Sequence, residues 1–485
     1  MAEHGIQLLD GSSASQIMHY SLKAAVEAYP LVFNEVNFPE KLEDFKKGYV
    51  DILPQFEAAR VTSHARADIA RLLAEAFQMQ IIYRNHDGQR QLQEHLQQPA
   101  KPLEIARLSP NCEPGWKPSL HFLKRDWPNL TRLGNALLSE NIISPAASEA
   151  LAWLAQDLGN DDQVNLSQRK VVVFGASAEM APTLQFNAAG AEILWLDLAP
   201  PAALVASQCR GSGVQYPVNG VDLLRQPAET LATILAFADG QPLDLCLYAY
   251  APGQAREMRL AAAMNAQVNA LPRDIVKSVT LLLSPTTATP LDEKDLLALV
   301  TRKKNRPRWE AALDSLGLLG QGGGAVQQGA LGASRSLVSI QGASYQAAQY
   351  LAKLMTAEAW VASGQLSPRQ PANEQSRQHP TEPLRVSANT APITQTRSIA
   401  HPIFDAAFGG AAALGVQTFT PAQSQTLNGL LAVHDWCHPD PAIPGKIRVH
   451  GGIHTLPYPM ETALKVAAAI GFAQSPRLLG GLFRP

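Results

Sequence analysis

The sequence predicts an α/β protein in which a mainly helical N-terminal domain precedes a doubly wound parallel sheet. Residues 1–165 contain long segments whose apolar residues recur three and four positions apart, which is the helical period. From residue 166 onward, short β-rich runs alternate with Ala-rich helical runs. Such alternation is typical of βαβ units with helices on both faces of a parallel sheet. We therefore expect one domain over 1–165 and a second over 166–485.

In the first part, helices are predicted at Ala65–Tyr83 and Ala146–Leu158. The Pro-rich stretch Gln98–Pro118 between them is expected to be a loop. The second part contains seven predicted strands: Lys170–Phe174, Glu192–Leu196, Leu243–Tyr248, Ser278–Leu283, Leu337–Ile340, Leu384–Ala388 and Lys446–Val449.

Two insertions are expected in the second part, at 285–334 and 363–383. The first contains the Gly-rich run Gln321–Ala333 and the second is the polar, Pro-rich run Ser363–Pro383, so both runs are predicted to be loops. A lid over a substrate, formed by these two insertions, is a hypothesis that rests on their length.

The composition excludes several classes of protein. Hydrophobic residues make up 46 % of the 485 residues, which is enough for a sizeable core. Lys and Arg number 40 against 42 Asp and Glu, whereas nucleic-acid-binding proteins usually have a basic surplus. No apolar run is long enough to span a membrane, and the N-terminus lacks the pattern of a secretory signal. We expect a cytoplasmic protein with neither nucleic acid nor membrane as a partner.

The first βαβ unit predicts a dinucleotide site of the Rossmann type. Its first strand ends at Gly175, where a small residue lets the backbone approach a pyrophosphate at the N-terminus of the next helix. Ala176 and Ser177 continue this turn. The second strand ends at Asp197, whose carboxylate can accept hydrogen bonds from the adenosine ribose and would repel a 2′-phosphate. NAD is therefore favoured over NADP, although Glu179 stands where a glycine is usual.

Four later segments follow one another in a characteristic order: Gly220–Leu223 (GVDL), Leu247–Gly253 (LYAYAPG), Leu384–Thr396 (LRVSANTAPITQT) and Pro444–Ile453 (PGKIRVHGGI). This order resembles the short-chain dehydrogenase/reductase superfamily over roughly residues 168–455. The resemblance implies that Asp222 approaches the adenine and that Ala249 lies in the turn after the fourth strand. It also implies that Pro392 and Thr394 lie at the nicotinamide end.

In that family a Tyr is the general acid and a Lys four residues later lowers its pKa. Tyr345, at the start of an Ala-rich helix, is the natural match, but Gln349 stands four residues later and carries no charge. Lys353 lies two turns along, rotated by about 80° from Tyr345 at 3.6 residues per turn. Tyr350 with Lys353 is the alternative pair.

The family also uses a Ser that orients the carbonyl, and two residues match it. Ser284 ends the predicted strand SVTLLLS, but it lies much farther from Tyr345 than the family's spacing. Ser339 ends the strand LVS directly before the helix. If Ser339 has this role, Ser278–Leu283 needs another place in the sheet.

Two further groups of residues were considered as sites. His434 and His438, and likewise His450 and His454, have HxxxH spacing, but two glycines follow His450 and no CxxC pair occurs, so we expect no metal site. The basic run Arg302–Arg308 is expected to be solvated; docking of a phosphate-bearing or acyl-carrier substrate is the alternative.

The resemblance implies an NAD(P)-dependent oxidoreductase that interconverts a carbonyl and an alcohol of a small-molecule substrate, and a homo-oligomer. A 3-oxoacyl-type compound or another ketone fits this reaction. Two other classes stay open. One is a non-catalytic Rossmann module that binds a nucleotide or a partner, and the other is a non-redox enzyme, such as a dehydratase or epimerase, on the same fold.

Overall fold

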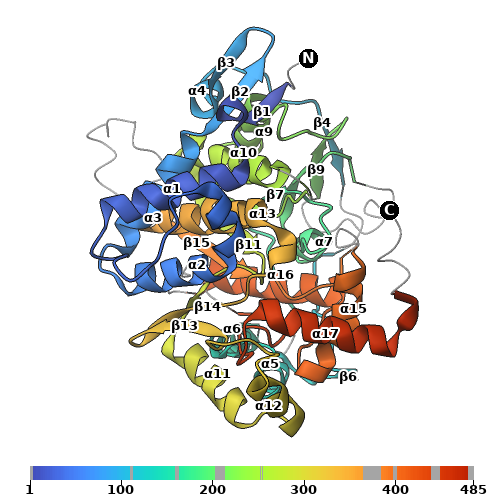
Figure 1. The fold of residues 1–485 in the computed structure, drawn as a ribbon. Coiled ribbons are helices and arrows are strands. Elements are labelled where there is room, and N and C mark those ends of the chain that lie inside the picture. The colour runs from blue at the N-terminus through green and yellow to red at the C-terminus, as the bar shows by residue number, and fades with distance from the viewer. Residues whose placement is uncertain are drawn as a thin grey trace.

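The computed structural model describes residues 4–109, 113–158, 163–201, 213–251, 253, 255–363, 384–396, 401–438 and 448–478. Within them lies a mixed α/β fold around a seven-stranded, mostly parallel sheet (Figure 1). The strand order is β15-β11-β10-β7-β8-β9-β4. In chain order the strands are β4 (Ile105–Leu108), β7 (Lys170–Phe174), β8 (Glu192–Leu196), β9 (Val214–Pro217), β10 (Leu243–Leu247), β11 (Val276–Leu283) and β15 (Arg385–Thr390). Six strands are parallel, and β4 runs antiparallel to β9 at one edge.

The two faces of the sheet belong to different hydrophobic clusters because successive side chains of a strand point to opposite faces. In β7, Val172 and Phe174 belong to one cluster, whereas Val171 and Val173 belong to the other. All four side chains are fully buried. Burial on both faces explains why this strand reads as a continuous apolar run.

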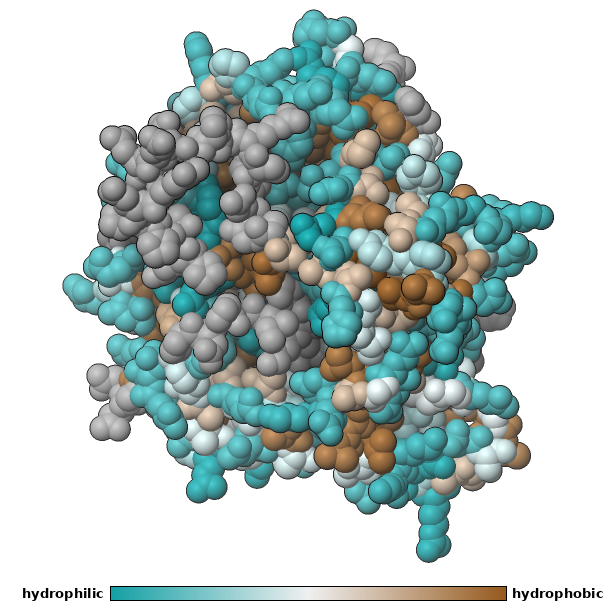
Figure 2. All heavy atoms as spheres, turned by 90° about the vertical axis from the view of Figure 1, so that its left-hand side faces the viewer, coloured by the Kyte–Doolittle hydropathy of each residue, from teal (hydrophilic) through white to brown (hydrophobic). Residues whose placement is uncertain are grey.

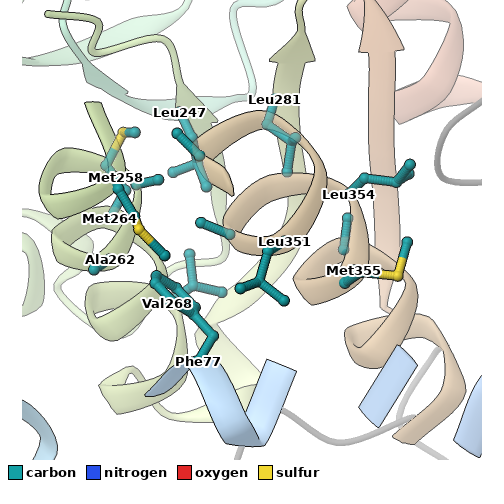
Figure 3. Packing of buried hydrophobic residues seen from close by; sticks show 14 of the residues in the cluster. Phe77, Leu247, Met258, Ala262, Met264, Val268, Leu281, Leu351, Leu354 and Met355 are labelled. Atoms are coloured by element: carbon teal, nitrogen blue, oxygen red, sulfur yellow. The ribbon is translucent and has the colours of Figure 1, made fainter. Parts of the chain in front are cut away.

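The first cluster contains α10 (Arg256–Ala270) and the π-helix η5 (Ala347–Met355), together with the N-terminal helices α1 (Ala14–Ala28), α2 (Leu42–Thr62) and α3 (Arg66–Gln78). Figure 3 shows Phe77 of α3 beside Leu351 of η5 and Val268 of α10. A small antiparallel sheet of β1 (Gly5–Leu8), β2 (Ile81–Asn85) and β3 (Gly88–Gln91) lies at the same end of the chain. A separate helical domain over 1–165 is therefore not confirmed, because these helices share one core with the sheet.

The second cluster contains α5 (Leu130–Ser139), α6 (Pro145–Asp157), α7 (Thr183–Ala188) and α16 (Pro421–Cys437). A third, smaller cluster joins α15 (Pro402–Gly410) and α17 (Met460–Gln474), which lie side by side (Figure 1). Further elements are α4 (Leu92–Leu96), β5 (His121–Phe122), β6 (Arg125–Asp126), α9 (Pro227–Ala238), α13 (Ala343–Gln346), α14 (Thr356–Ser363) and the short 3₁₀ helices η1 (Leu9–Gly11), η3 (Arg273–Ile275), η4 (Ser339–Gln341) and η7 (Ala411–Leu414).

Several predicted elements are confirmed. Strands β7 and β8 have the predicted bounds, β10, β11 and β15 agree within two residues, and α6 matches the second predicted helix. Other predictions were wrong. The helix expected to reach Tyr83 ends at Gln78 because Ile81–Asn85 pair with β1, and the expected loop Gln98–Pro118 contains β4. Residues Leu337–Ile340 form no strand, since Ser339–Gln341 make a 3₁₀ turn.

The last predicted strand begins outside the described residues, and Val449 makes only an isolated bridge with Ile143. The insertion 285–334 is not simply a loop. It forms β12 (Pro290–Leu291), α11 (Glu293–Lys304), α12 (Arg308–Ser315), β13 (Ala325–Gln328) and β14 (Leu331–Ser334). The Gly-rich run is thus the hairpin β13–β14, and Thr62 of α2 donates a hydrogen bond to Gln328 in it. The second predicted loop, from residue 364 to 383, lies outside the described residues.

No helix in the part of the chain that the structure describes is long and apolar enough to cross a membrane. The face shown in Figure 2 is mostly hydrophilic, and its hydrophobic residues form small groups among hydrophilic ones.

Candidate functional site

Two cavities, each of about 280 Å³, adjoin at the carboxyl ends of the parallel strands. The first, called here the tyrosine cavity, is lined by Tyr345 and Ser284. The second, called the aspartate cavity, is lined by Asp197 and Asp222. Ala178 and Tyr250 line both cavities, so the two are neighbours.

In the tyrosine cavity, Ser284 and Tyr345 come together from distant parts of the sequence. Ser284 directly follows β11, and Tyr345 lies in the short helix α13. Both side chains line the cavity, and Ser284 is close enough to act on the Tyr345 phenol as a hydrogen-bond partner. Burial raises the pKa of the Tyr345 phenol well above its usual value, and the hydrogen bond with Ser284 opposes this shift only in part. The phenol therefore holds its proton at neutral pH.

The two alternatives from the sequence lie elsewhere. Ser339 does not line the cavity; its N–H and its hydroxyl donate to the Glu461 carboxylate over 2.7 and 2.9 Å. Tyr350 is fully buried in the first cluster, where its hydroxyl donates to Glu57. Ser284, which follows β11 next to the edge strand β15, is the strand-end serine that shares a cavity with Tyr345.

Gln349 and Lys353 also line the tyrosine cavity and are joined there by Glu257 of α10. The Lys353 ammonium donates to Glu257 Oε1 over 2.7 Å, and the Gln349 amide donates to the same oxygen over 3.0 Å. Gln349 Oε1 accepts the N–H of Ser284 over 2.9 Å. The rotation of about 80° expected between Tyr345 and Lys353 assumed an α-helix. Residues 347–355 instead form a π-helix, which has more residues per turn, so the side chains point in other directions than expected.

Glu257 was not found from the sequence, although a signal was present. A carboxylate at this position is in phase with the buried residues Ala261, Met264 and Val268 of the same helix. A charged residue on an apolar helix face needs a partner, because burying an unpaired charge is costly. Glu257 is 4 % exposed, and its partners are Lys353, Gln349 and the N–H of Ala251.

The aspartate cavity contains most residues that the sequence predicted for a cofactor. Gly175 has a φ of +73°, and a Cβ on it would lie 2.3 Å from the Cα of Ala249, so only glycine fits this turn. Asp197 Oδ2 accepts hydrogen bonds from the N–H and the hydroxyl of Ser177 over 2.8 and 2.7 Å. Asp222 Oδ1 accepts the N–H of Leu224 over 3.0 Å. These Gly, Ser, Ala and Asp residues all line the cavity.

The connection after β7 differs from the predicted one. Ala176 is buried beneath the turn and lines neither cavity; its carbonyl accepts a hydrogen bond from Thr183 over 2.7 Å. Helix α7 begins only at Thr183 and has six residues. It therefore does not place a long helix dipole directly at the turn. Glu179, in the intervening segment, lines the tyrosine cavity.

Basic residues and the N-terminal segment complete the aspartate cavity. Arg225, Arg256 and Arg259 line it, and Arg256 is exposed at the start of α10. Ile6 of β1 also lines it, and this strand is held by a hydrogen bond from the Ile6 N–H to the Leu224 carbonyl over 2.8 Å. No motif in the first residues pointed to this role, so the sequence analysis missed it.

One side of the tyrosine cavity, called here the apolar wall, is built by two helical stripes. Residues Phe404, Ala407, Phe408 and Ala411 come from α15 and the turn after it, and Met460, Ala463, Leu464 and Ala467 come from α17. Both sets repeat at the helical period, so each helix presents one face to the cavity. Pro392 and Thr394, which follow β15, line the same cavity.

The histidines and the basic run have structural contacts. His434 and His438 stack on each other, and His450 and His454 are buried as a second pair. His454 Nε2 donates to the Pro285 carbonyl over 2.9 Å. Among the described residues no group of His, Cys, Asp and Glu could hold a metal ion. Arg302 of the basic run is not solvated as expected, since it donates to the Gly452 carbonyl over 2.6 Å.

Comparison with known proteins adds no family. No family model matches the chain, and no curated protein matches it either.

Proposed function

We propose that this protein is an NADH-dependent oxidoreductase of the short-chain dehydrogenase/reductase type that reduces a carbonyl compound to an alcohol. The observation that carries the proposal is that Ser284 and Tyr345 line one cavity, which adjoins the aspartate cavity. In this proposal, Tyr345 gives a proton to the carbonyl oxygen and Ser284 orients that oxygen.

The topology of the sheet supports a Rossmann-type site. Numbered along the chain from β7, the six parallel strands have the order 3-2-1-4-5-6, which is that of dinucleotide-binding sheets. The order reverses between β7 and β10, and in such sheets ligands bind beyond the carboxyl ends of the strands at this point. Gly175, after β7, and Ala249, after β10, lie on its two sides.

The aspartate cavity fits the adenosine part of NAD better than the expected turn fits its diphosphate. Asp197 and Asp222 would hold the ribose and the adenine, and the acid at residue 197 disfavours a 2′-phosphate. The helix start expected at the diphosphate is displaced to Thr183, so the exposed Arg256 would supply positive charge instead. When bound, the cofactor supplies the hydride, and the protein supplies position and proton.

The groups around Tyr345 keep its phenol in the protonated form that carbonyl reduction uses. Oxidation of an alcohol needs a phenolate as the base, and a free cation nearby would stabilise it. Here the charge of Lys353 is neutralised by Glu257, and burial keeps the Tyr345 phenol protonated. A protonated phenol is ready to donate its proton. Instead, Lys353 and Gln349 both donate hydrogen bonds to Glu257. Gln349 in turn holds Ser284 by accepting the hydrogen bond of its backbone N–H.

A titration of the purified protein with NADH and with NADPH, followed by nicotinamide fluorescence, tests the proposal. Saturable binding with NADH tighter than NADPH is expected, and carbonyl-dependent oxidation of NADH should follow. Tighter NADPH would contradict the role of Asp197. The absence of binding by either cofactor would contradict the proposal as a whole.

One observation favours a second candidate, a nucleotide-binding module or non-redox enzyme on this fold. Gln349 carries no charge where the family has its Lys, and the charge of Lys353 is paired with Glu257, so neither residue is a free cation that would lower the pKa of Tyr345. Binding of a nucleotide without NADH oxidation by any carbonyl would favour it. We further propose a cytoplasmic homo-oligomer, as the resemblance implies, and sedimentation of the purified protein tests its assembly.

A further inference from the structure

The apolar wall gives the tyrosine cavity two chemically different sides. Its eight residues carry no polar side chain other than the thioether of Met460. Ser284, which follows β11, and Tyr345, in α13, contribute polar groups to the same cavity. A ligand whose reacting oxygen lies at Ser284 therefore meets an apolar surface with the rest of its structure.

The polar side chains nearest Ser284 are already hydrogen-bonded to one another. Thr286 is bonded to Ser284 over 2.8 Å and to Gln341 over 2.6 Å. Gln349 is bonded to Ser284 and Glu257. Lys353 is the one Lys or Arg among the described residues that line this cavity, and its charge is paired with Glu257 over 2.7 Å. A substrate carboxylate or phosphate would be buried here without a free counter-charge, which is unfavourable.

Helices α15 and α17 pack closely together, and this packing explains the small residues along the wall. A Cβ on Gly410 would lie 2.0 Å from the Ala467 carbonyl oxygen, and one on Gly471 would lie 1.8 Å from that of Ala406. These glycines let the helix backbones touch. Four alanines then face the cavity, namely Ala407, Ala411, Ala463 and Ala467, and small side chains of this kind leave room along the wall.

We propose that the substrate is a carbonyl compound with an unbranched aliphatic chain, and that this chain lies along the apolar wall. This inference rests on the proposed function, because it takes Ser284 and Tyr345 as the place of the carbonyl. The aliphatic chain of the substrate carries no charged group where it lies in the cavity. Short, charged keto acids and sugars are not substrates of this site.

A homologous series of alkan-2-ones, from 2-hexanone to 2-dodecanone, tests the inference by calorimetric binding without cofactor. Burial of one methylene contributes about 0.8 kcal/mol, so the affinity should rise by at most about fourfold per added carbon and then level off. Equal affinity along the series would overturn the inference.

A pair of variants on one helix localises the chain. Ala463→Leu fills the cavity and should weaken 2-dodecanone at least about tenfold while leaving 2-hexanone unchanged, since two or three buried methylenes are lost. Ala469→Leu, on the exposed side of α17, is the matched control and should change neither. If Ala463→Leu does not fold, Ala407→Leu on α15 makes the same test from the other helix. Identical behaviour of the cavity variant and the control would overturn the inference.

The same ketones, assayed with NADH, separate this inference from the proposed function. Binding that grows with chain length, but without NADH oxidation, would contradict the oxidoreductase and support the chain site. Oxidation of NADH with equal kcat/KM for 2-butanone and 2-dodecanone would support the oxidoreductase and contradict the chain site.

Discussion

Lys353 Nζ lies 2.7 Å from Glu257 Oε1, and both side chains are almost closed to solvent. Removing one partner of a buried ion pair leaves the other charge unpaired in a medium of low polarity. Glu257→Ala should therefore lower the free energy of unfolding by about 3 kcal/mol, as urea denaturation would measure.

The double variant Glu257→Gln with Lys353→Met removes both charges and should recover most of this loss. Lys294→Met removes an exposed ion pair with Glu149 and should cost less than about 1 kcal/mol. Equal losses for the buried and exposed pairs would show that the Lys353–Glu257 pair does not stabilise the site.

Tyr345→Phe should lower kcat for carbonyl reduction by about 10²- to 10⁴-fold, because a positioned general acid contributes about that much. The dissociation constant for NADH should stay unchanged, since the phenol lines only the tyrosine cavity. Steady-state kinetics and fluorescence titration measure the two quantities. Ser284→Ala should also lower kcat, whereas Ser339→Ala, which lies outside the cavity, should not. Full activity of the Tyr345→Phe variant would rule out proton transfer by Tyr345.

Asp197→Ser should weaken the binding of NADH by about tenfold or more. It should also raise the affinity for NADPH relative to that for NADH. Hydrogen bonds to charged groups contribute about 1.5–3 kcal/mol, and the substitution removes the charge that repels a 2′-phosphate. Asp222→Ala is the comparison, because a residue at the adenine should weaken both cofactors alike. Unchanged selectivity in the Asp197 variant would mean that this carboxylate serves only the turn, through Ser177.

Protonation of His454 should make the protein less stable in mildly acidic solution. Burial lowers its pKa from 6.5 to about 4, so between these values the unfolded chain binds the proton more strongly than the folded one. The neutral His454 side chain makes its full contribution to the free energy of unfolding above pH 6.5. This contribution, up to about 3 kcal/mol, is lost as the pH falls toward 4. Denaturation of the wild type and of His454→Gln at pH 7 and pH 5 should show a smaller drop for the variant.

The sequence was most informative where local pattern decides structure. Continuous apolar runs located β7 and β8 with their ends, because strands buried on both faces leave no polar residue in the pattern. Spacing was misleading near Lys353, because a π-helix is not visible in apolar periodicity. Short edge strands such as β4 escaped for a related reason: four half-exposed residues in a Pro-rich stretch do not resemble a strand until a partner pairs with them.

The candidate site residues also divide into those that a local pattern in the sequence indicated and those that it could not indicate. Gly175, Asp197 and Ser284 were identified because they follow strands, and the carboxyl ends of parallel strands meet at one edge. The choice between Ser284 and Ser339 needed the order of strands in the sheet, which is a long-range property. The apolar wall was also out of reach, because its helices show the same periodicity as helices that simply pack against a core.

Strand β4 covers β9 and forms one edge of the sheet. Its residues Ile105–Leu108 pair antiparallel with Val214–Pro217 and occupy backbone donors and acceptors that an edge strand would otherwise present to other molecules. A chain that begins at residue 166 would lack this cover as well as α1–α3, and its exposed strand edge would invite aggregation during folding. A chain of residues 166–485 alone should therefore aggregate more than the full chain, so this part should be produced with residues 1–165 attached.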